Sequence, residues 1–293
     1  MLLSSFIKES TAALSSLYPE PEARNVILML CSAILGTKSY THITEPSTQV
    51  AADRLPSLQA ALSRLCNAEP IQYVLGRCEF CDRVFRVSPA VLIPRPETEM
   101  LAMECVRMAR EMQKSDPGRP VRVLDMCTGS GCIAWTIALS VPGVQVVGVD
   151  ISDDALAVAS AQDFAEECRR TGAFAPAFVK ADVLKAPELE GPFDLIVSNP
   201  PYIMDSERQA MRRNVLEYEP SLALFVPDSD PLLFYRAVAF WATSLLAADG
   251  SGMVEANELL GDSTLEAFIS AGFGNSEKID DFFGKFRFVR FSR

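Results

Sequence analysis

Apolar and polar positions follow three successive patterns along the chain. Over residues 1–70, hydrophobic side chains recur at three- and four-residue spacing, as at Leu55, Leu58, Ala61 and Leu65, and this spacing predicts amphipathic helices. Residues 71–96 change character: a short linker hairpin is indicated by Val74, Phe80, Val84, Phe85 and Val87, and the segment ends in a proline-rich stretch. We therefore expect a small N-terminal helical domain over 1–70, a linker over 71–96 and a larger domain over 97–293.

Strand and helix patterns alternate in the larger domain. Strands are expected at 121–126, 144–150, 177–181, 193–198 and 253–255. Helices are expected at 97–114, 132–139, 152–170, 231–247 and 259–270, and the tail, 278–283 with 286–291, is typical of an antiparallel hairpin. Such alternation predicts an α/β fold in which helices cover both faces of a mostly parallel sheet.

Composition and charge narrow the class of function. The chain has 293 residues, of which 49% are hydrophobic and 22% charged, as in a globular protein, and no apolar run is long enough for a membrane span. Eight cysteines are scattered singly and no signal-peptide layout is present, so we expect a cytoplasmic protein with reduced thiols. A net charge of −11 argues against a broad grip on nucleic acid and favours a small ligand or a basic protein partner. We expect a monomer.

Three predicted strands end in residues that suit a nucleotide-like cofactor, because ligands of open α/β sheets bind at the carboxyl ends of the strands. The first strand leads into the turn Asp125–Gly131, and the second ends in Asp150, nineteen residues after Gly131, where a carboxylate accepts hydrogen bonds from ribose hydroxyls. The third ends in Asp182-Val183, placed for an adenine. The glycine turn alone is equally compatible with a plain strand–helix connection. The predicted cofactor-binding residues are Asp125, Cys127, Thr128, Gly129, Ser130, Gly131, Asp150, Ile151, Asp182, Val183 and Asn199.

The chemistry of the turn selects among cofactors. It lacks the Gly-Lys-Ser/Thr of a triphosphate-binding loop, and Ala134 and Trp135 follow where a dinucleotide fingerprint has its third glycine. Asp125 would repel a pyrophosphate and attract a cation. S-adenosylmethionine, with a sulfonium, an ammonium and no phosphate, fits this turn best, and we expect no metal.

The fourth strand end is Ser198-Asn199-Pro200-Pro201-Tyr202. Two prolines make the turn stiff and extended, so an asparagine oxygen and nearby carbonyls form a rigid set of acceptors for a planar –NH2 group. A proline-rich loop with a capping asparagine is the simpler interpretation. The predicted catalytic residues are Asn199, Pro200 and Tyr202, and the predicted substrate-binding residues are Asn199, Pro200, Pro201 and Tyr202.

These motifs, together with Glu69–Gly76, Val91–Glu99 and Tyr218–Leu224, resemble the PrmC/HemK family of glutamine N-methyltransferases over essentially the whole chain. Ile-Pro-Arg-Pro-Glu-Thr-Glu at 93–99 is the family-specific part. The resemblance implies a Rossmann-like S-adenosylmethionine-dependent methyltransferase with a seven-stranded sheet. It also implies methylation of N5 of the glutamine in the Gly-Gly-Gln motif of peptide chain release factors, with the N-terminal domain helping to dock the release factor.

Two positions depart from the family pattern. Cys127 replaces the first glycine of Asp-x-Gly-x-Gly-x-Gly, and a cysteine is tolerable there only if the backbone is extended, because side chains disfavour positive φ. Glu255-Ala256-Asn257-Glu258 replaces the usual Glu-x-Gly.

Other interpretations remain open. Asn-Pro-Pro-Tyr also occurs in amino-methyltransferases of nucleic-acid bases, and a binding protein that has lost its cofactor through Cys127 is a further alternative. Cys78 and Cys81 have half the spacing of a zinc site, but no second pair of ligands completes it. For Arg95 and Glu97 the two interpretations are a structural ion pair that locks the domain junction and a role in ordering the substrate channel.

Overall fold

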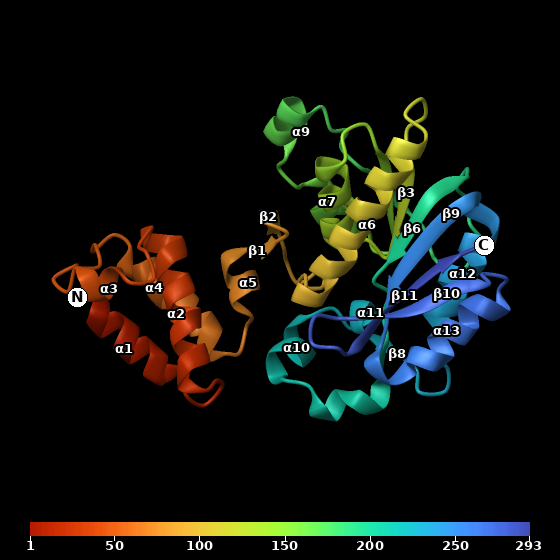
Figure 1. Ribbon diagram of the computed structural model, residues 1–293. Coiled ribbons are helices and arrows are strands. Elements are labelled where there is room, and N and C mark those ends of the chain that lie inside the picture. The colour runs from red at the N-terminus through yellow and green to blue at the C-terminus, as the bar shows by residue number, and fades with distance from the viewer. The chain divides into compact units, whose positions relative to one another are not determined.

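The chain folds into two compact units, which the computed structural model describes over all of residues 1–293 (Figure 1). One unit comprises residues 1–77 and 212–218, and the other comprises residues 78–211 and 219–293. The roles predicted for the 1–70 and 97–293 domains stay predictions.

The first unit is built from helices. Its helices are α1 (Leu3–Ala13), α2 (Glu20–Leu35), α3 (Thr41–Thr44), α4 (Leu55–Cys66), α5 (Ile71–Leu75) and α10 (Arg213–Tyr218). Helices α1, α2 and α4 bury a common apolar core that includes Phe6, Ile27 and Leu58, as the three- and four-residue spacing predicts. Residues 212–218 join this unit through polar contacts: Arg212 donates to Glu22 at 2.6 Å, and the Tyr218 hydroxyl donates to the Asn67 carbonyl at 2.8 Å.

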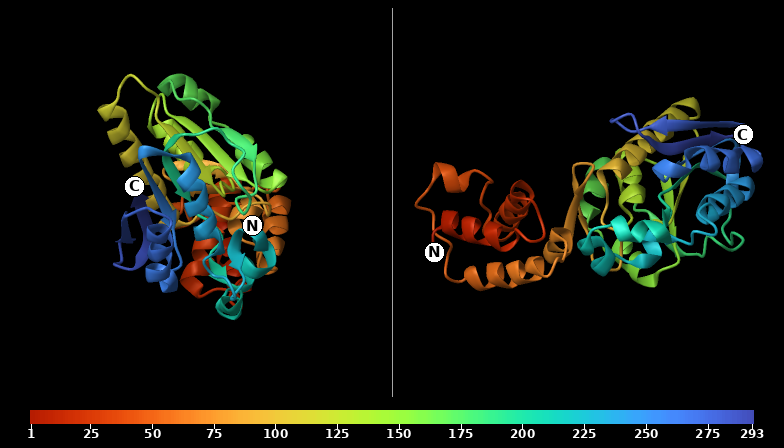
Figure 2. Two further views of the ribbon diagram at one scale, coloured as in Figure 1. Left: turned by 90° about the vertical axis from the view of Figure 1, so that its right-hand side faces the viewer. Right: turned by 90° about the horizontal axis from the view of Figure 1, so that it is seen from below.

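The second unit is built on a seven-stranded sheet (Figures 1 and 2). Its spatial order is β10-β11-β9-β6-β3-β4-β5, in which the last five strands are parallel and β11 is antiparallel to both β9 and β10. The strands are β3 (Arg122–Met126), β4 (Gln145–Asp150), β5 (Ala177–Lys180), β6 (Phe193–Ser198), β9 (Leu246–Glu255), β10 (Asn275–Asp280) and β11 (Phe286–Ser292). The predicted mostly parallel sheet with an antiparallel C-terminal hairpin is confirmed.

Helices and short strands complete this unit. The helices are α6 (Pro96–Ser115), α7 (Cys132–Ser140), α8 (Asp153–Ser160), α9 (Ala165–Thr171), α11 (Ser221–Leu224), α12 (Leu233–Leu245) and α13 (Gly261–Ser270), with 3-10 turns η1 (Asp205–Ala210) and η2 (Glu258–Leu260). Strands β1 (Arg77–Phe80) and β2 (Arg83–Arg86) form a hairpin, and β7 (Ile203–Met204) pairs with β8 (Phe225–Val226). None of the helices combines the length and the apolarity needed to cross a membrane.

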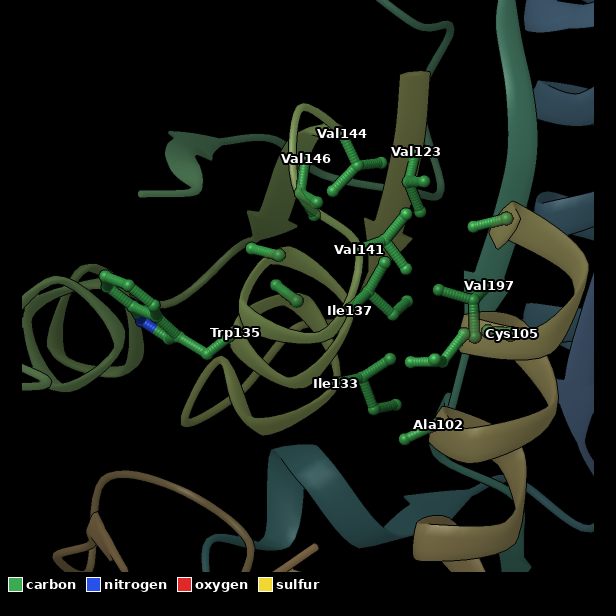
Figure 3. Close-up of a cluster of buried hydrophobic side chains, with 14 of the residues drawn as sticks. Ala102, Cys105, Val123, Ile133, Trp135, Ile137, Val141, Val144, Val146 and Val197 are labelled. Carbon is green, nitrogen blue, oxygen red and sulfur yellow. The ribbon is translucent and has the colours of Figure 1, made fainter. Parts of the chain in front are cut away.

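Hydrophobic side chains cover both faces of the sheet. Neighbouring residues of one strand enter opposite cores: Val123 packs with α6 and α7, whereas Leu124 packs with α12. In Figure 3, Ile133 and Ile137 of α7 point towards Cys105 of α6 and towards the sheet. Because both faces are buried, the polar groups of the central strands gather where those strands end.

One predicted helix, 152–170, is wrong as a single element, because the structure has α8 and α9 with a break at residues 161–164. Gln162 is buried there and bonds the backbone of Arg86 and Ser130, at 2.8 to 3.0 Å, while the Phe164 ring packs 5.3 Å from the Trp135 ring. Two positions apart on a helix point to nearly opposite sides, so both side chains reach the interior only where the helix is interrupted.

The strand predicted at 253–255 is also too short, because β9 begins at Leu246. Its glycines concealed the strand pattern, since glycine is depleted in strands. At Gly252 the reason for glycine is a close contact: a Cβ atom there would lie 2.1 Å from the Phe291 ring of the adjacent strand.

Candidate active site

The carboxyl ends of the parallel strands meet at one edge of the sheet. Met126 pairs with Ser198, and Ser198 pairs with Val254, so β3, β6 and β9 end side by side. This register brings the glycine turn after β3, the Asn-Pro-Pro-Tyr turn after β6 and Glu255 of β9 to the same place. Parallel pairing therefore assembles the predicted site from segments that are far apart in the sequence.

A cavity of about 1080 Å³, counted out to its open mouth, lies at this edge. No lysine or arginine lines it, and its acidic lining residues are Asp150 and Asp182. The remaining walls are mainly apolar and include Ile151, Val183 and Phe234. Such a cavity favours a neutral or cationic ligand with an aromatic or apolar part over one that carries phosphate.

The turn after β3 is held in a fixed shape by backbone hydrogen bonds, one to β4 and one within the turn. Thr128 N–H donates to the Val149 carbonyl at 2.9 Å, and Gly131 N–H donates to the Thr128 carbonyl at 2.8 Å. Gly131 has φ +76°, and a Cβ there would lie 2.9 Å from the Phe178 ring, so glycine is needed both for conformation and for space.

Cys127 adopts φ +59°, which is the left-handed region. The backbone at Cys127 is therefore not extended, which is the conformation in which a cysteine would be tolerable here. Glycine adopts the observed conformation at a lower free-energy cost than cysteine does. Burial raises the pKa of the Cys127 thiol, and the neighbouring Asp150 raises it further. The thiol is thus a neutral lining group of the cavity, not a nucleophile.

Asp125 lies beneath the turn and does not line the cavity. Its Oδ2 accepts hydrogen bonds from the Thr128 hydroxyl at 2.6 Å and from Ala134 N–H at 3.1 Å, whereas its buried Oδ1 has no partner. Burial raises the pKa of Asp125 to about 7, against the opposing effect of these two donors. In this structure the carboxyl group braces the turn from within.

Asp150 faces the cavity from the end of β4. Its Oδ2 accepts from Gly129 N–H at 2.9 Å and its Oδ1 from Ser152 N–H at 3.0 Å. A carboxylate oxygen has two acceptor sites, so each oxygen retains capacity for a ligand hydroxyl. Burial raises the pKa of Asp150, and the backbone donors oppose that rise.

The Asn-Pro-Pro-Tyr turn is tied to α6 and β9 by hydrogen bonds. Asn199 Nδ2 donates to the Thr98 hydroxyl at 3.0 Å, and Thr98 donates to Glu255 Oε2 at 2.7 Å. The Tyr202 hydroxyl donates to the other oxygen of Glu255 at 2.9 Å. No protein group donates to Asn199 Oδ1 or to the Pro200 carbonyl; Asn199 lines the cavity, whereas Pro200 is buried beside it.

The structure brings most of the predicted site residues to the cavity and places four elsewhere. The predicted residues that line it are Cys127, Thr128, Gly129, Ser130, Asp150, Ile151, Asp182, Val183, Asn199 and Pro201. Asp125, Gly131, Pro200 and Tyr202 do not line it. Thr98 lines the cavity without having been assigned a role, although it belongs to the Ile-Pro-Arg-Pro-Glu-Thr-Glu stretch at 93–99.

A further wall comes from the loop before α6, where Ala90, Leu92 and Pro94 line the cavity. Buried Glu219 fixes this loop, because it accepts from Ile93 N–H at 3.1 Å and from Arg95 Nη2 at 2.6 Å. The ion pair of Arg95 is thus with Glu219, not with Glu97 as the sequence suggested.

Comparison with known proteins identifies related sequences and folds. A family profile described as "Methyltransferase small domain" matches residues 107–218, and one described as "PrmC N-terminal domain" matches residues 6–76. The hMettl16 catalytic domain, solved in complex with MAT2A 3'UTR hairpin 6, shares the fold, with a TM-score of 0.52 at 12% identity over 71% of this chain and 74% of that one. The protein is therefore of the Rossmann-like methyltransferase class.

The relatives specify the family. The release factor glutamine methyltransferase of Flavobacterium psychrophilum is 35% identical over 290 residues, 99% of either chain. That of Bacteroides thetaiotaomicron is 36% identical over 292 residues, again 99% of either chain. The chain belongs to the PrmC/HemK family of release factor glutamine methyltransferases, which are S-adenosylmethionine-dependent enzymes.

Proposed function

We propose that this enzyme transfers a methyl group from S-adenosylmethionine to N5 of the glutamine in the Gly-Gly-Gln motif of peptide chain release factors. The observation that carries the proposal is the orientation of Asn199: its amide nitrogen is engaged by Thr98, which leaves Oδ1 as an acceptor beside the cavity. A glutamine side chain ends in a planar –NH2, whose two donors match Asn199 Oδ1 and the Pro200 carbonyl.

The cavity fits S-adenosylmethionine. Asp150 has free acceptor sites for the ribose hydroxyls, and Ile151, Asp182 and Val183 form a wall suited to adenine. The turn Cys127–Gly131 would border the methionine part, where no cationic side chain opposes the ligand's own positive charge. S-adenosylmethionine, when bound, supplies an electrophilic methyl group on a sulfonium.

The chain's own residues orient the acceptor. An amide nitrogen is a weak nucleophile because its lone pair is delocalised into the carbonyl. Two acceptors that hold both N–H groups fix the nitrogen and favour the pyramidal geometry that frees the lone pair. Positioning of this kind contributes up to about 7–11 kcal/mol in favourable intramolecular reactions. The Tyr202 hydroxyl is bound to Glu255, so this residue holds the turn in place from behind.

The proposal also covers the docking of the substrate, the oligomeric state and the compartment. We propose that the helical unit, residues 1–77 with 212–218, docks the release factor, that the enzyme acts as a monomer, and that it works in the cytosol. The eight cysteines are all unpaired, which suits a reducing compartment. The acidic charge of −11 and the absence of cationic cavity residues disfavour a nucleic-acid substrate.

Incubation of the enzyme with S-adenosylmethionine and a recombinant release factor, followed by intact-mass measurement, tests the proposal. One added methyl group is expected. A release factor whose Gly-Gly-Gln glutamine is changed to asparagine is the matched substrate control and should gain none. An equal gain on both substrates, or none on either, would refute the proposed substrate.

A further inference from the structure

The Asn199 amide belongs to a chain of hydrogen bonds that ends on a buried carboxylate. Asn199 Nδ2 donates to Thr98, and Thr98 donates to Glu255 Oε2. Thr98 is 3% exposed and Glu255 is 1% exposed, so water does not substitute for these partners. Glu255 also accepts from the Tyr202 hydroxyl, which ties both ends of the Asn-Pro-Pro-Tyr turn to one residue.

The chemistry of the three groups fixes the direction of every bond in this chain. A carboxylate has only acceptors, so the Thr98 hydroxyl must direct its single proton to Glu255. Thr98 then presents only lone pairs to Asn199. The asparagine amide must meet them with its –NH2, which turns Oδ1 away from Thr98. The charge of Glu255 thus determines the orientation of an amide that it does not touch.

We propose that Thr98 and Glu255 are positioning residues that orient the Asn199 amide so that its oxygen, and not its nitrogen, meets the substrate. The inference rests on the proposed function, because it concerns the same site. An amide rotated by half a turn would present a donor to the two donors of the substrate –NH2. The rotated amide does not bind the glutamine productively, because the –NH2 of Asn199 and the –NH2 of the substrate are both donors and no acceptor lies between them.

The charged residues near Glu255 do not take part in the hydrogen bonds that orient the Asn199 amide. Arg287 of β11 and Glu97 of α6 lie near Glu255, but its hydrogen-bond donors are the hydroxyls of Thr98 and Tyr202. Burial raises the pKa of Glu255, while these two hydroxyls and Arg287 lower it. The hydroxyl donors therefore favour the ionised form on which the direction of the chain depends.

Variants at Thr98 and Glu255 test the proposal. Thr98→Val keeps the shape of the side chain and removes the acceptor for Asn199, whereas Thr98→Ser keeps the hydroxyl. Glu255→Gln keeps the shape but allows its amide to donate to Thr98. Thr264→Val is the matched control, because Thr264 is another fully buried threonine and its hydroxyl has no partner.

The readouts are kcat and KM for the release factor and the Kd for S-adenosylmethionine. We expect Thr98→Val and Glu255→Gln to lower kcat by tenfold or more, while the Kd for S-adenosylmethionine changes less than threefold. Thr98→Ser and Thr264→Val should retain kcat within threefold of the wild type. A Thr98→Val enzyme with wild-type kcat would overturn the proposal. So would an equal loss in Thr264→Val, since that would indicate a general effect of removing a buried hydroxyl.

A second measurement keeps this test independent of the proposed substrate. If the wild-type enzyme methylates no release factor, the proposed function fails, and the positioning role is decided by the side-chain amide resonances of 15N-asparagine-labelled protein. The chain holds six asparagines, and the pair of –NH2 resonances that is lost in Asn199→Ala belongs to Asn199. Thr98→Val and Glu255→Gln should shift the Asn199 –NH2 resonances, and Thr264→Val should not. Unchanged Asn199 resonances in both variants would contradict the positioning role.

Discussion

The side-chain nitrogen of Asn199 donates a 3.0 Å hydrogen bond to the hydroxyl of Thr98, a residue 101 positions earlier in the chain. Thr98 belongs to the first turn of α6, and Asn199 follows the strand β6. The contact joins the Ile-Pro-Arg-Pro-Glu-Thr-Glu stretch at 93–99 to the Asn-Pro-Pro-Tyr turn. It leaves the side-chain oxygen of Asn199 available at the cavity.

Asn199→Ala removes the proposed acceptor for the substrate amide. We expect kcat to fall by at least a hundredfold, because both the orientation of the nitrogen and one of its two acceptors are lost. Asn199→Asp keeps an acceptor but places a carboxylate beside Thr98, which has no proton left to donate. We expect kcat of this variant to fall by a comparable factor. Initial rates of methyl transfer, with folding checked by circular dichroism, measure the effect. Retention of more than a tenth of the wild-type rate in Asn199→Ala would exclude the proposed role.

Cys127→Gly should relieve backbone strain. At φ +59° a residue with a side chain is disfavoured relative to glycine by about 1–2 kcal/mol, and the greater freedom of glycine in the unfolded chain offsets about 0.5–1 kcal/mol of this. Compared with Cys127→Ala, which keeps the strain, Cys127→Gly should be more stable by about 0.5–1 kcal/mol. Urea unfolding of the two variants provides the comparison. An alanine variant as stable as the glycine variant would show that the turn bears no strain at this position.

Arg95→Met should destabilise the fold by leaving the buried carboxylate of Glu219 without its cation. Removal of one partner of a fully buried pair costs about 3–5 kcal/mol. Here the Arg95 side chain retains 32% exposure, so we expect about 2 kcal/mol. The double variant Arg95→Met/Glu219→Gln should lose less than Arg95→Met alone, because the glutamine still accepts from Ile93 N–H without a buried charge.

Arg213→Met is the control for that experiment, since it breaks an exposed pair with Glu217 and should destabilise the protein much less than Arg95→Met does. Chemical denaturation of the wild type, Arg95→Met, Glu219→Gln and the double variant gives the coupling energy of the pair directly, and Arg213→Met is measured beside them. If Arg95→Met were no more destabilising than Arg213→Met, the Arg95–Glu219 pair would not hold the loop before α6.

Asp125 should make the ligand-free protein less stable as the pH rises. Burial raises its pKa to about 7, whereas an unfolded aspartate has a pKa near 3.8, so between these values the folded state binds the proton more tightly. Its contribution to stability is complete below about pH 4 and is lost as the pH rises through about 7, with an upper limit of about 4 kcal/mol. Asp125→Asn does not titrate, so its free energy of unfolding should rise relative to the wild type between pH 5 and pH 8. A difference that is independent of pH would contradict the raised pKa.

The elements and the cofactor edge could be predicted from the sequence because their signals are local. A glycine turn after an apolar strand, and an acid nineteen residues after Gly131, are contained within short windows. The break at 161–164 was not predicted because it depends on contacts of Gln162 with Arg86 and Ser130, which lie outside the helix pattern. Local signals thus identify elements but not the interruptions that tertiary contacts impose on them.

The polar network at Asn199 could not be predicted for the same reason. Thr98 and Glu255 are 157 positions apart, and their contact requires the order β9-β6-β3, in which a late strand lies beside an early one. The partner of Arg95 was likewise assigned to nearby Glu97, whereas the structure supplies Glu219, 124 positions away. Thr98 belongs to the family-specific stretch at 93–99, which marks it as a candidate site residue. That stretch does not indicate the hydrogen-bond partners of Thr98.

The most direct test of the proposed methylation site is a crystal structure of the enzyme with S-adenosylhomocysteine and a peptide that contains Gly-Gly-Gln. We predict that the glutamine side-chain nitrogen lies within hydrogen-bonding distance of Asn199 Oδ1 and the Pro200 carbonyl, with Asn199 Nδ2 still donating to Thr98. A glutamine that bound away from Asn199, or that met its Nδ2, would refute this site.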